Sequence, residues 1–480
     1  SDVCSSDLTF SLRVSRFPHP MPWGTAPPQS GGRSTGRSGR QPGAAVGQNR
    51  SVKWTNWAGN QVARPETLEN PVDEGAVAEI VARAHASGRA VRVAASGHSF
   101  TAAAVSNDVM MKVDALSGIR SVDRQNMTVT VGAGTPLWRL NDLLHREGLA
   151  LPNLGDIAYQ TVAGAISTST HGTGVSIGGL ATQVRGLRLV DGRGEVVVCT
   201  GTENADVLDV ARVSVGSLGV ITECTLSVVP SFLLRATEMP MRVDAVLENL
   251  DDLVSTNDHF EFFWVPHTGW ALTKRNNRVE GLREPLPKVR GWFEKTFMEN
   301  YAFGAVCVAG RLVPSAIPRL AKALPASGER TYSDDSFRIF ASPRLVKFYE
   351  MEQAMPYDAV GPALNEIRAM VDRKGYKLNF PVEVRFTAGD DIPLSTAHGR
   401  TSAYIAVHIF KGMEHEPFMR DVEDILRTHD ARPHWGKIHF READELSRLY
   451  PRWGDFIAMR DRLDPDRTFR NDYSRRGFGA

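Results

Sequence analysis

The chain carries the run Val162-Ala163-Gly164-Ala165-Ile166-Ser167-Thr168-Ser169-Thr170-His171-Gly172-Thr173-Gly174, in which small and hydroxylated residues predominate. Small residues let main-chain N–H groups approach a diphosphate closely, and Ser and Thr hydroxyls add donors without steric bulk. The run is therefore suited to line an anion site for a dinucleotide. Ordinary turns have a similar composition, so this run alone leaves both interpretations open.

A second loop of this kind, Ser96-Gly97-His98-Ser99, directly follows a predicted strand at Ala90–Ala94. A predicted helix precedes the strand, and Asp73 can cap it while Gly88 ends it. The apolar face of this helix consists of Val77, Ile80, Val81 and Ala84. Helix and strand together have the pattern of half a βαβ unit.

A second unit of the same kind is predicted farther along the chain. It combines the strand Met127–Val131, the turn Gly132-Ala133-Gly134-Thr135-Pro136 and a helix with Leu137, Leu140, Leu143 and Leu144 on one face, which Gly148 ends. The turn does not make a nicotinamide-binding Rossmann site, because the third glycine of that fingerprint is absent. A P-loop is excluded too, since no glycine-rich stretch ends in Gly-Lys-Ser or Gly-Lys-Thr.

Strand patterns dominate the rest of the chain. We expect strands at Gly186–Val190, Glu195–Cys199 and Gly219–Val229, the first two joined by the hairpin signal Asp191-Gly192. Beyond Pro230 the glycine density falls and longer patterns appear, including strands at Phe260–Val265, Lys377–Phe386 and Thr401–Phe410. The sequence therefore predicts an α+β protein with one domain at residues 54–232 and another at residues 233–480.

Composition excludes several classes of protein. Hydrophobic residues make up 42% and charged residues 23% of the 480 residues, which is typical of a globular protein. The net charge of +1 argues against nucleic acid as a partner. The sequence shows neither an apolar stretch long enough to span a bilayer nor a secretory signal, which predicts a cytoplasmic protein and leaves peripheral membrane contact open.

Two further features concern the cysteines and the start of the chain. Cys4, Cys199, Cys224 and Cys307 are scattered without metal-site spacing, so we predict reduced, mostly buried thiols and no metal site.

Residues 1–53 are crowded with Gly, Ser, Pro and Arg. They are predicted to be a disordered extension, or the product of mistaken translation upstream of the real start.

Four ordered motifs carry a family resemblance. They are Val91-Arg92-Val93-Ala94-Ala95-Ser96-Gly97-His98-Ser99-Phe100, Asn153-Leu154-Gly155-Asp156-Ile157, the run at 162–174, and Arg432-Pro433-His434-Trp435-Gly436-Lys437. In this order, between about Asn56 and Tyr473, the chain resembles the aldonolactone oxidoreductases, which are flavoproteins of the vanillyl-alcohol-oxidase type. The resemblance implies a PCMH-type FAD-binding domain followed by an α+β substrate domain, whose C-terminal segment packs back near the flavin.

The resemblance also implies which residues hold FAD. These are Ser96, Gly97, His98, Ser99, Phe100, Gly155, Asp156, Gly164, Ser167, Thr168, Thr170, His171, Gly172, Thr173, Gly174, Gly216, Gly219 and Ile221. The Ser96–Ser99 loop would wrap the diphosphate, and His98 would bind the flavin covalently through its 8α-methyl group. Most relatives have glycine at Ala95, where alanine would strain the loop if φ were positive.

On the substrate side, a period of two places Glu383 and Arg385 on one face of a strand, which alone is typical of a solvated edge or a salt bridge. The resemblance implies that this face lies over the flavin. We expect Arg385 to hold substrate oxygens, Glu383 to orient or deprotonate the reacting hydroxyl, and Lys437 to place positive charge near flavin N1. His408 and His434 are further candidates, for which core or capping roles are nearly as plausible.

The implied reaction is the oxidation of a sugar-1,4-lactone (gulono-, galactono- or arabinono-lactone) or an alditol, by hydride transfer to flavin N5. Gly155 stands where family dehydrogenases tend to carry alanine, so it leaves room for dioxygen and favours an oxidase that forms hydrogen peroxide. The alternatives are a dehydrogenase that passes electrons to a cytochrome or quinone, and a flavin-holding protein that has lost catalysis. The presence of Glu383, Arg385 and Lys437 argues against the last.

Overall fold

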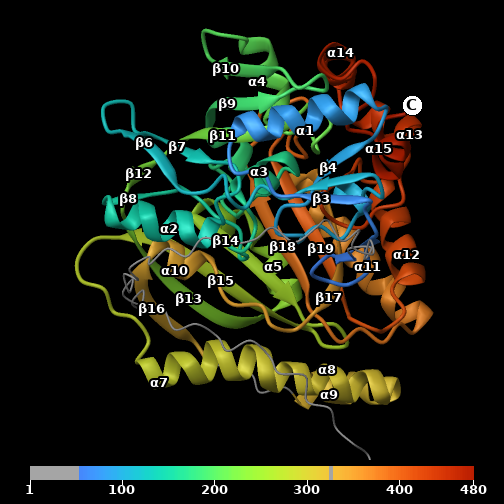
Figure 1. Ribbon diagram of the computed structural model, residues 1–480. Coiled ribbons are helices and arrows are strands. Elements are labelled where there is room, and N and C mark those ends of the chain that lie inside the picture. Colours follow the sequence, from blue (N-terminus) through green and yellow to red (C-terminus); the bar gives the residue numbers. More distant parts are fainter. Residues whose placement is uncertain (1–52, 324–327, 480) are drawn as a thin grey trace, which may run out of the picture. The chain divides into compact units, whose positions relative to one another are not determined.

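Two β-sheets of different size carry the architecture in the computed structural model, which describes residues 53–323 and 328–479 (Figure 1). The smaller is antiparallel, with its strands in the order β10 (Val196–Thr200), β9 (Val184–Val190), β11 (Val220–Ser227), β7 (Thr128–Gly132) and β6 (Ile119–Asp123). The larger is also antiparallel, in the order β16 (Arg330–Asp335), β13 (Leu233–Arg242), β15 (Trp270–Val279), β14 (His259–Trp264), β18 (Val382–Thr387), β19 (Ser402–Phe410), β17 (Phe348–Pro356) and β20 (Arg432–Pro433). With helices packed around both, the predicted α+β class is confirmed.

The first predicted helix and strand are confirmed as part of a small parallel sheet, in the order β3 (Thr67–Glu69), β5 (Val109–Met111) and β4 (Val91–Val93). Helix α1 (Glu74–Ala86) connects β3 to β4. Its N-terminus is capped by Asp73, whose Oδ1 accepts a hydrogen bond of 2.8 Å from the backbone N–H of Ala76. The loop that follows β4 is thereby held at the edge of a parallel sheet.

The prediction of a second βαβ-like unit is wrong. Strand β7 pairs antiparallel with β6 and β11, and α2 (Leu137–Arg146) leads instead to β8 (Leu149–Ala150), which pairs with β12 (Val229–Pro230). The helix itself is as predicted, with Leu137, Leu140 and Leu144 buried and the helix ending before Gly148. A strand followed by a helix does not specify the strand's partners, which are set by contacts distant in sequence.

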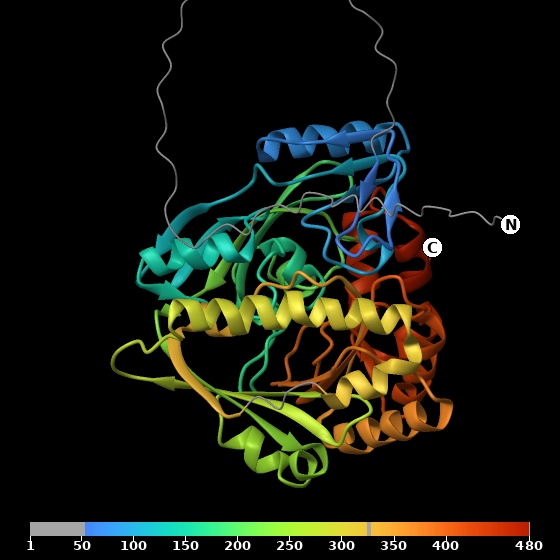
Figure 2. The same ribbon diagram turned by 90° about the horizontal axis from the view of Figure 1, so that it is seen from below.

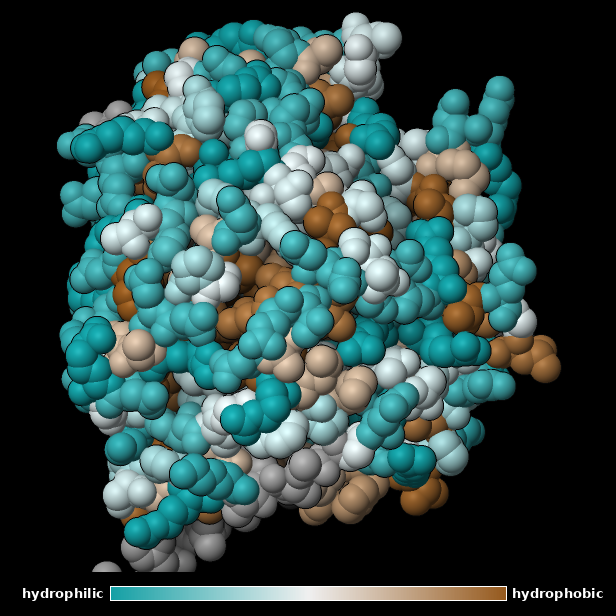
Figure 3. All heavy atoms as spheres, turned by 180° about the vertical axis from the view of Figure 1, so that it is seen from behind, coloured by the Kyte–Doolittle hydropathy of each residue, from teal (hydrophilic) through white to brown (hydrophobic). Residues whose placement is uncertain are grey.

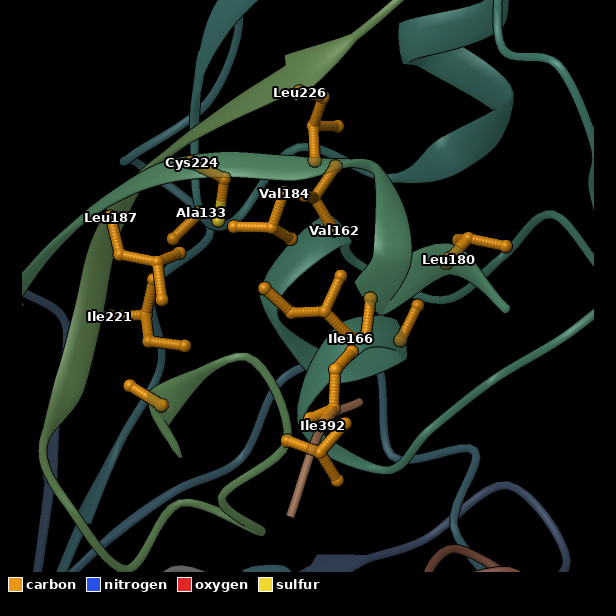
Figure 4. Close-up of a cluster of buried hydrophobic side chains, with 14 of the residues drawn as sticks. Ala133, Val162, Ile166, Leu180, Val184, Leu187, Ile221, Cys224, Leu226 and Ile392 are labelled. Carbon is orange, nitrogen blue, oxygen red and sulfur yellow. The ribbon is translucent and has the colours of Figure 1, made fainter. Parts of the chain in front are cut away.

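A short helix anchors the glycine-rich run in the hydrophobic core. Helix α3 (Val162–Ser167) points Val162 and Ile166 at side chains from the five-stranded sheet (Figure 4). The surrounding apolar side chains include Ala133, Leu180, Val184, Leu187, Ile221, Cys224, Leu226 and Ile392. With this face buried, the residues after α3 have a defined position next to the parallel sheet.

The eight-stranded sheet has one apolar and one polar face. Its apolar face packs against α5 (Val243–Glu248), α6 (Leu250–Ser255), α11 (Val360–Lys374) and α12 (Glu416–Arg427). In β18, Val382, Val384 and Phe386 are on this face, whereas Glu383 and Arg385 are on the other, as the alternation predicts. Strand β18 begins five residues later than the predicted Lys377, directly after Pro381, which has no N–H to donate to a sheet.

The C-terminal segment returns to the earlier half of the chain through α13 (Ala443–Leu449), α14 (Trp453–Leu463) and α15 (Asp472–Phe478). The backbone N–H of Val91 donates to the carbonyl of Thr468 at 2.8 Å. The side-chain amide of Asn471 donates to the carbonyls of Ala102 and Val105, each at 2.9 Å. These last residues therefore brace the segment around β4.

The remaining elements are short, apart from one helical layer. They comprise β1 (Trp54–Thr55), β2 (Val62–Ala63), α4 (Ala205–Ala211), α10 (Ser336–Phe340) and the 3-10 turns Ala102–Ala104, Leu180–Gln183, Pro314–Ala316 and Tyr357–Ala359. The layer consists of α7 (Lys288–Gly291), η3 (Trp292–Ala302), α8 (Phe303–Leu312) and α9 (Ile317–Ala323). Seen from below, it crosses the outside of the molecule as a long yellow helix followed by a shorter one (Figure 2).

The predictions of domain boundaries and thiols have different outcomes. All described residues belong to one compact unit, so the division into residues 54–232 and 233–480 stays a prediction, and residues 1–52 and Cys4 lie outside the described part. The thiols of Cys199, Cys224 and Cys307 are free and buried, as predicted. In the described ranges, no helix has the length and hydropathy to cross a membrane.

Candidate active site

A cavity of about 120 Å³ lies between the loop after β4 and helix α3. The predicted cofactor residues that line it are Ser96, Gly97, His98, Ser99, Gly164, Ser167, Thr168, Gly216, Gly219 and Ile221. They come from three segments that are far apart in sequence. Folding thus brings most of the predicted cofactor residues to one hollow.

The loop after β4 has the geometry of an anion cradle. Gly97 has a φ of +68°, a left-handed conformation that favours glycine, and a Cβ there would also approach the Trp54 ring to 3.2 Å. Ala95 does not have a positive φ, so alanine causes no strain at this position. Within the described residues, the backbone N–H groups of 95–99 donate to no protein acceptor, which leaves them available to an anion.

A buried guanidinium, which sequence reasoning did not select, lies at the wall of this cavity. Arg92 donates only to backbone carbonyls, including those of Gly216 at 2.9 Å and Val215 at 2.8 Å. Burial lowers its pKa to about 10, so it remains charged at neutral pH. Among the described residues no carboxylate hydrogen-bonds to it, and its charge therefore adds to the attraction for a diphosphate.

His98 stands at the junction of this cavity with a second, smaller one. The second cavity is lined by Trp57, His98, Ser99, Phe100, Ile157, Gln160, His434, Gly436 and Lys437. The His98 ring stacks on Trp57 with centroids 5.6 Å apart. Burial, with the positive charge of Lys437, lowers the pKa of His98 to about 4. The imidazole is therefore neutral, as a nucleophile has to be, and the predicted residues Phe100, His434 and Lys437 are its neighbours in this cavity.

The end of the glycine-rich run lies elsewhere than the sequence led us to expect. Thr170, His171, Gly172, Thr173 and Gly174 line neither cavity, but cross to the eight-stranded sheet, where the N–H of Gly174 donates to the Phe386 carbonyl at 2.8 Å. A Cβ on Gly172 would come within 2.3 Å of the Leu154 carbonyl. At this end of the run, the small residues allow close packing of the chain on itself.

Gly155 and Asp156 also lie outside the two cavity linings. A Cβ on Gly155 would approach the carbonyl oxygen of His171 to 3.1 Å, so an alanine here would require a small shift of the backbone. Asp156 forms ion pairs with Arg344 at 2.9 Å and with Arg385 at 3.5 Å. It therefore belongs to a charged cluster on the polar face of the eight-stranded sheet.

Arg385 is the centre of that cluster. Its guanidinium pairs with Glu383 on the same strand, with Glu261 of β14 at 2.8 Å, and with Asp156. Burial raises the pKa of Glu383 to about 8, against the opposing charge of Arg385. Burial acts in the same direction on Asp156, but Arg385 and Arg344 hold its pKa well below the usual range. Of the two readings that the alternation alone offers, the salt bridge between Glu383 and Arg385 is present, but not at a solvated edge, because both residues are buried in the middle of the sheet.

A second buried pair involves Lys437, whose ammonium contacts Glu350 of β17. Against the effect of burial, the charge of Glu350 raises the pKa of Lys437, and Glu350 likewise raises the pKa of His408, whose Nε2 lies 3.5 Å away. Burial lowers the pKa of His434 to about 3. Lys437 therefore carries positive charge near neutral pH, whereas His434 is neutral and its Nδ1 accepts from the N–H of Gly436.

Several charged residues of the site were missed by sequence reasoning, namely Arg92, Glu261, Lys274, Arg344, Glu350 and Glu352. Glu350 and Glu352 alternate with apolar residues in β17, and Glu352 lies 3.2 Å from His171. Glu261 lies in a predicted strand, and an acidic residue between Phe260 and Phe262 was a signal in the sequence that could have identified it. Lys274 completes the cluster at 3.2 Å from Glu261. In the described ranges, no group of His, Cys, Asp and Glu side chains could hold a metal ion.

Taken together, the site joins an anion cradle to a buried set of acids and bases. The cradle offers backbone donors and a guanidinium, which fits the diphosphate of a dinucleotide cofactor. Lys437 supplies a positive charge in the second cavity beside His98, and Glu383 of the buried cluster supplies a carboxyl that can exchange a proton near neutral pH. Such groups serve the oxidation of an alcohol carbon, in which a hydroxyl proton leaves and negative charge develops on the acceptor.

Comparison with known proteins identifies the same two functions in the sequence. A family model described as "D-arabinono-1,4-lactone oxidase" matches residues 224–477, and one described as "FAD binding domain" matches residues 65–200. A solved structure of cholesterol oxidase from B. sterolicum superposes with a TM-score of 0.76 over 90% of this chain and 99% of that chain, at 16% identity. This likeness shows the fold alone.

Three curated relatives are similar over nearly their whole length. The L-gulono-1,4-lactone dehydrogenase of Mycobacterium tuberculosis is 42% identical over 430 residues, covering 89% of this chain and 99% of the relative. The L-gulonolactone oxidase of Mus musculus is 33% identical with the same coverage, and the alditol oxidase of a Streptomyces species is 30% identical, covering 88% and 99%. The chain therefore belongs to the D-arabinono-1,4-lactone oxidase family, the aldonolactone oxidoreductases of vanillyl-alcohol-oxidase type, and is an FAD-dependent oxidoreductase that acts on CH–OH groups.

Proposed function

We propose that the protein oxidises a hydroxyl-bearing carbon of a sugar-1,4-lactone (gulono-, galactono- or arabinono-lactone) or an alditol, and that dioxygen is reduced to hydrogen peroxide. The observation that carries this proposal is the buried cluster of Arg385, Glu383, Glu261 and Asp156, in which Asp156 interacts electrostatically with Lys437 of the second cavity. A polyhydroxylated substrate matches such a cluster, since its hydroxyls can satisfy several buried polar groups at once. The relatives named for gulonolactone and alditol support this substrate class.

Each residue of the cluster has a distinct role in the proposal. Bound FAD supplies the two-electron acceptor for the substrate carbon. Arg385 holds the substrate oxygens, because its planar guanidinium donates several hydrogen bonds in a fixed geometry. Glu383 accepts the hydroxyl proton, and Lys437 stabilises negative charge at the cofactor end. His408 keeps Glu350 in place behind Lys437.

The substrate itself is identified by a direct comparison. Anaerobic bleaching of the flavin is measured with gulono-, galactono- and arabinono-1,4-lactone and with xylitol, each at the same concentration. We expect at least one of them to bleach the flavin within a turnover time. If none of these compounds bleaches the flavin, the proposed substrate class is wrong.

The electron acceptor is a separate part of the proposal. Gly155 has no methyl group at the position where family dehydrogenases tend to carry alanine, which supports access of dioxygen, whereas the similarity to a dehydrogenase of M. tuberculosis favours a cytochrome or quinone as the alternative acceptor. We expect peroxide in amounts equal to the substrate oxidised, and a drop of about 10-fold or more in the rate of flavin reoxidation by air in Gly155→Ala. Dye reduction without peroxide would instead establish the dehydrogenase.

Covalent attachment of FAD at His98 is also a proposal, supported by its neutral imidazole at the junction of the two cavities. After acid precipitation, the flavin absorbance is expected to stay in the pellet of the unchanged protein and to move into the supernatant for His98→Ala. Ser99→Ala serves as the control, because Ser99 lines the same two cavities. Release of flavin from the unchanged protein by acid would exclude the bond.

The pH dependence of the reaction tests the role of Glu383. The charged groups that face it are Arg385, Asp156, Glu261 and His408. Because burial raises the pKa of Glu383 to about 8, the carboxyl is protonated at neutral pH, and it can accept the substrate proton only after losing its own. We therefore expect kcat/KM to rise with pH and level off above about pH 8. In Glu383→Gln the rate should be lower and independent of pH in this range.

The remaining proposals concern organisation and partners. We infer that residues 54–232 form the FAD-binding part and residues 233–480 the substrate-binding part, which is supported by the position of β13, the first strand of the larger sheet, directly after the boundary. The partner is a small molecule. The composition left peripheral membrane contact open. Such contact would need a part of the surface with apolar and basic side chains that can bind lipid.

A further inference from the structure

One helical segment of the protein has its apolar side on the outside. Elements α7, η3 and α8 continue one another without a break, since the residues at both junctions have helical dihedrals. The exposed large side chains of this segment are Val289, Trp292, Phe293, Phe297, Tyr301, Val308 and Leu312. Between Trp292 and Ala302 the segment is a π-helix, with α-helix on either side. Members of the set follow one another at one, three or four residues, with seven between Tyr301 and Val308, so each is next to another on the helix surface. We call this set the apolar stripe.

The degree of exposure along the stripe is unusual for side chains of this size. Val289 is 82% exposed, Trp292 55%, Phe293 49% and Leu312 73%. Single exposed apolar residues are normal on protein surfaces, but a contiguous apolar patch marks a surface that binds something. On the face shown in Figure 3, by contrast, most of the surface is hydrophilic and hydrophobic groups are scattered among the polar ones.

The two acidic residues of the same segment and Lys295 lie on its inner side. Glu294 and Glu299 pair with Arg330 of β16, at 3.1 and 3.2 Å, and the ammonium of Lys295 lies 4.2 Å from the centre of the Tyr332 ring. In an ordinary surface helix the polar side faces water and the apolar side faces the core. Here the inner side of η3 carries the acidic residues, whereas α8 packs on the protein through Phe303 and the buried Cys307. The stripe takes no part in these contacts.

The charges around the stripe indicate what covers it. Between residues 288 and 322 the only acidic residues are Glu294 and Glu299, which pair with Arg330, and Glu294 also pairs with Arg290 at 2.6 Å. The exposed basic residues are Lys288 and Arg290 at the start of the segment, Arg311 at its end, and Arg319 and Lys322 in α9 beyond it. Two copies of such a surface would bring like charges together. An apolar helix side with Trp and Phe and with basic residues at its ends is instead suited to the interface of an anionic bilayer.

We propose that the segment Lys288–Leu312 lies flat on an anionic membrane, with the apolar stripe at the acyl boundary and the basic residues at the lipid headgroups. This surface does not involve the cavities or the charged cluster of the active site. The proposal is therefore independent of the substrate and of the electron acceptor.

Co-sedimentation of the full chain with vesicles tests this proposal. Vesicles of phosphatidylcholine with phosphatidylglycerol are compared with vesicles of phosphatidylcholine alone. We expect binding to the anionic vesicles that weakens at high salt, and a loss of about 10-fold or more in partitioning for Phe293→Glu combined with Phe297→Glu. The matched control is Val72→Glu with Val196→Glu, which changes one exposed valine just before α1 and one in β10 and should bind like the unchanged protein. In Figure 1, α1 and β10 lie at the other end of the picture from α7 and α8.

Flavin absorbance and turnover verify that each variant is folded, and they should be unchanged because all four positions are exposed and outside the active site. Three outcomes would overturn the proposal. One is that the unchanged protein binds neither kind of vesicle, and another is that the Phe293/Phe297 variant binds as well as the unchanged protein. The third is a dimer in size-exclusion chromatography without lipid that becomes a monomer in this variant, which would make a second copy the partner of the stripe.

Discussion

Replacement of Lys437 by Met is expected to slow anaerobic flavin reduction by about 10²-fold or more while FAD stays bound. The ammonium of Lys437 is buried next to Glu350 and lines the small cavity beyond His98. Methionine keeps most of the length of the side chain but removes the only charge that it carries. A charge that stabilises the transition state in a site shielded from water contributes on this scale. Stopped-flow measurement of flavin bleaching gives the rate constant directly.

Lys347→Met is the matched control for Lys437→Met. Lys347 carries a positive charge near the same end of the site, where its ammonium lies 5.9 Å from the centre of the Trp57 ring, but it is exposed. Water screens an exposed charge, so we expect less than about a threefold change in the rate. Equal rates for Lys437→Met and the unchanged protein would exclude Lys437 from the mechanism.

Replacement of Arg385 by Ala is the second change with a large expected effect, again about 10²-fold or more on flavin reduction. Three carboxyl groups, those of Glu383, Glu261 and Asp156, surround the guanidinium. Its removal takes away the hydrogen-bond donors to the substrate. It also raises the pKa of Glu383 further, because the positive charge of Arg385 opposes the effect of burial on that pKa. The pH at which kcat/KM levels off should therefore move upward together with the loss in rate.

Loss of stability has to be separated from loss of catalysis in Arg385→Ala, because buried carboxylates without their partner destabilise a fold by about 3–5 kcal/mol. Arg344→Ala is the control, since Arg344 pairs with Asp156 but is not hydrogen-bonded to Glu383 or Glu261. We expect both variants to melt at lower temperature and only Arg385→Ala to lose the rate. If the two variants lose rate equally, Arg385 acts through stability alone.

Local patterns in the sequence predicted a substantial part of this fold. The cap at Asp73, the apolar face of α1 and the alternation in β18 depend on residues close together in sequence, and the structure contains all three. The loop Ser96–Ser99 was also recognisable, because its small residues follow directly on a strand. Features of this kind result from helix and strand geometry, which sequence patterns report well.

Features that depend on distant parts of the chain could not be predicted. Nothing local specifies that β7 pairs with β11, or that Thr170–Gly174 crosses to the other sheet. Glu350 becomes the partner of Lys437 only because β17 lies beside β19 and the C-terminal motif, and Glu261 meets Arg385 only because β14 and β18 are neighbours. The order of strands in a sheet is set by the packing of the whole chain.

The C-terminal residues that brace β4 have a consequence for biosynthesis. Phe469 provides a carbonyl to Arg92 at the cofactor cavity, and Asn471 binds the backbone at Ala102 and Val105. During translation Phe469 emerges from the ribosome 377 residues after Arg92. The cradle is thus complete only once this distant segment has been synthesised and has folded back, so the vitamin-derived prosthetic group is acquired late. Nascent chains that have not yet reached Asn471 should therefore be unable to retain it.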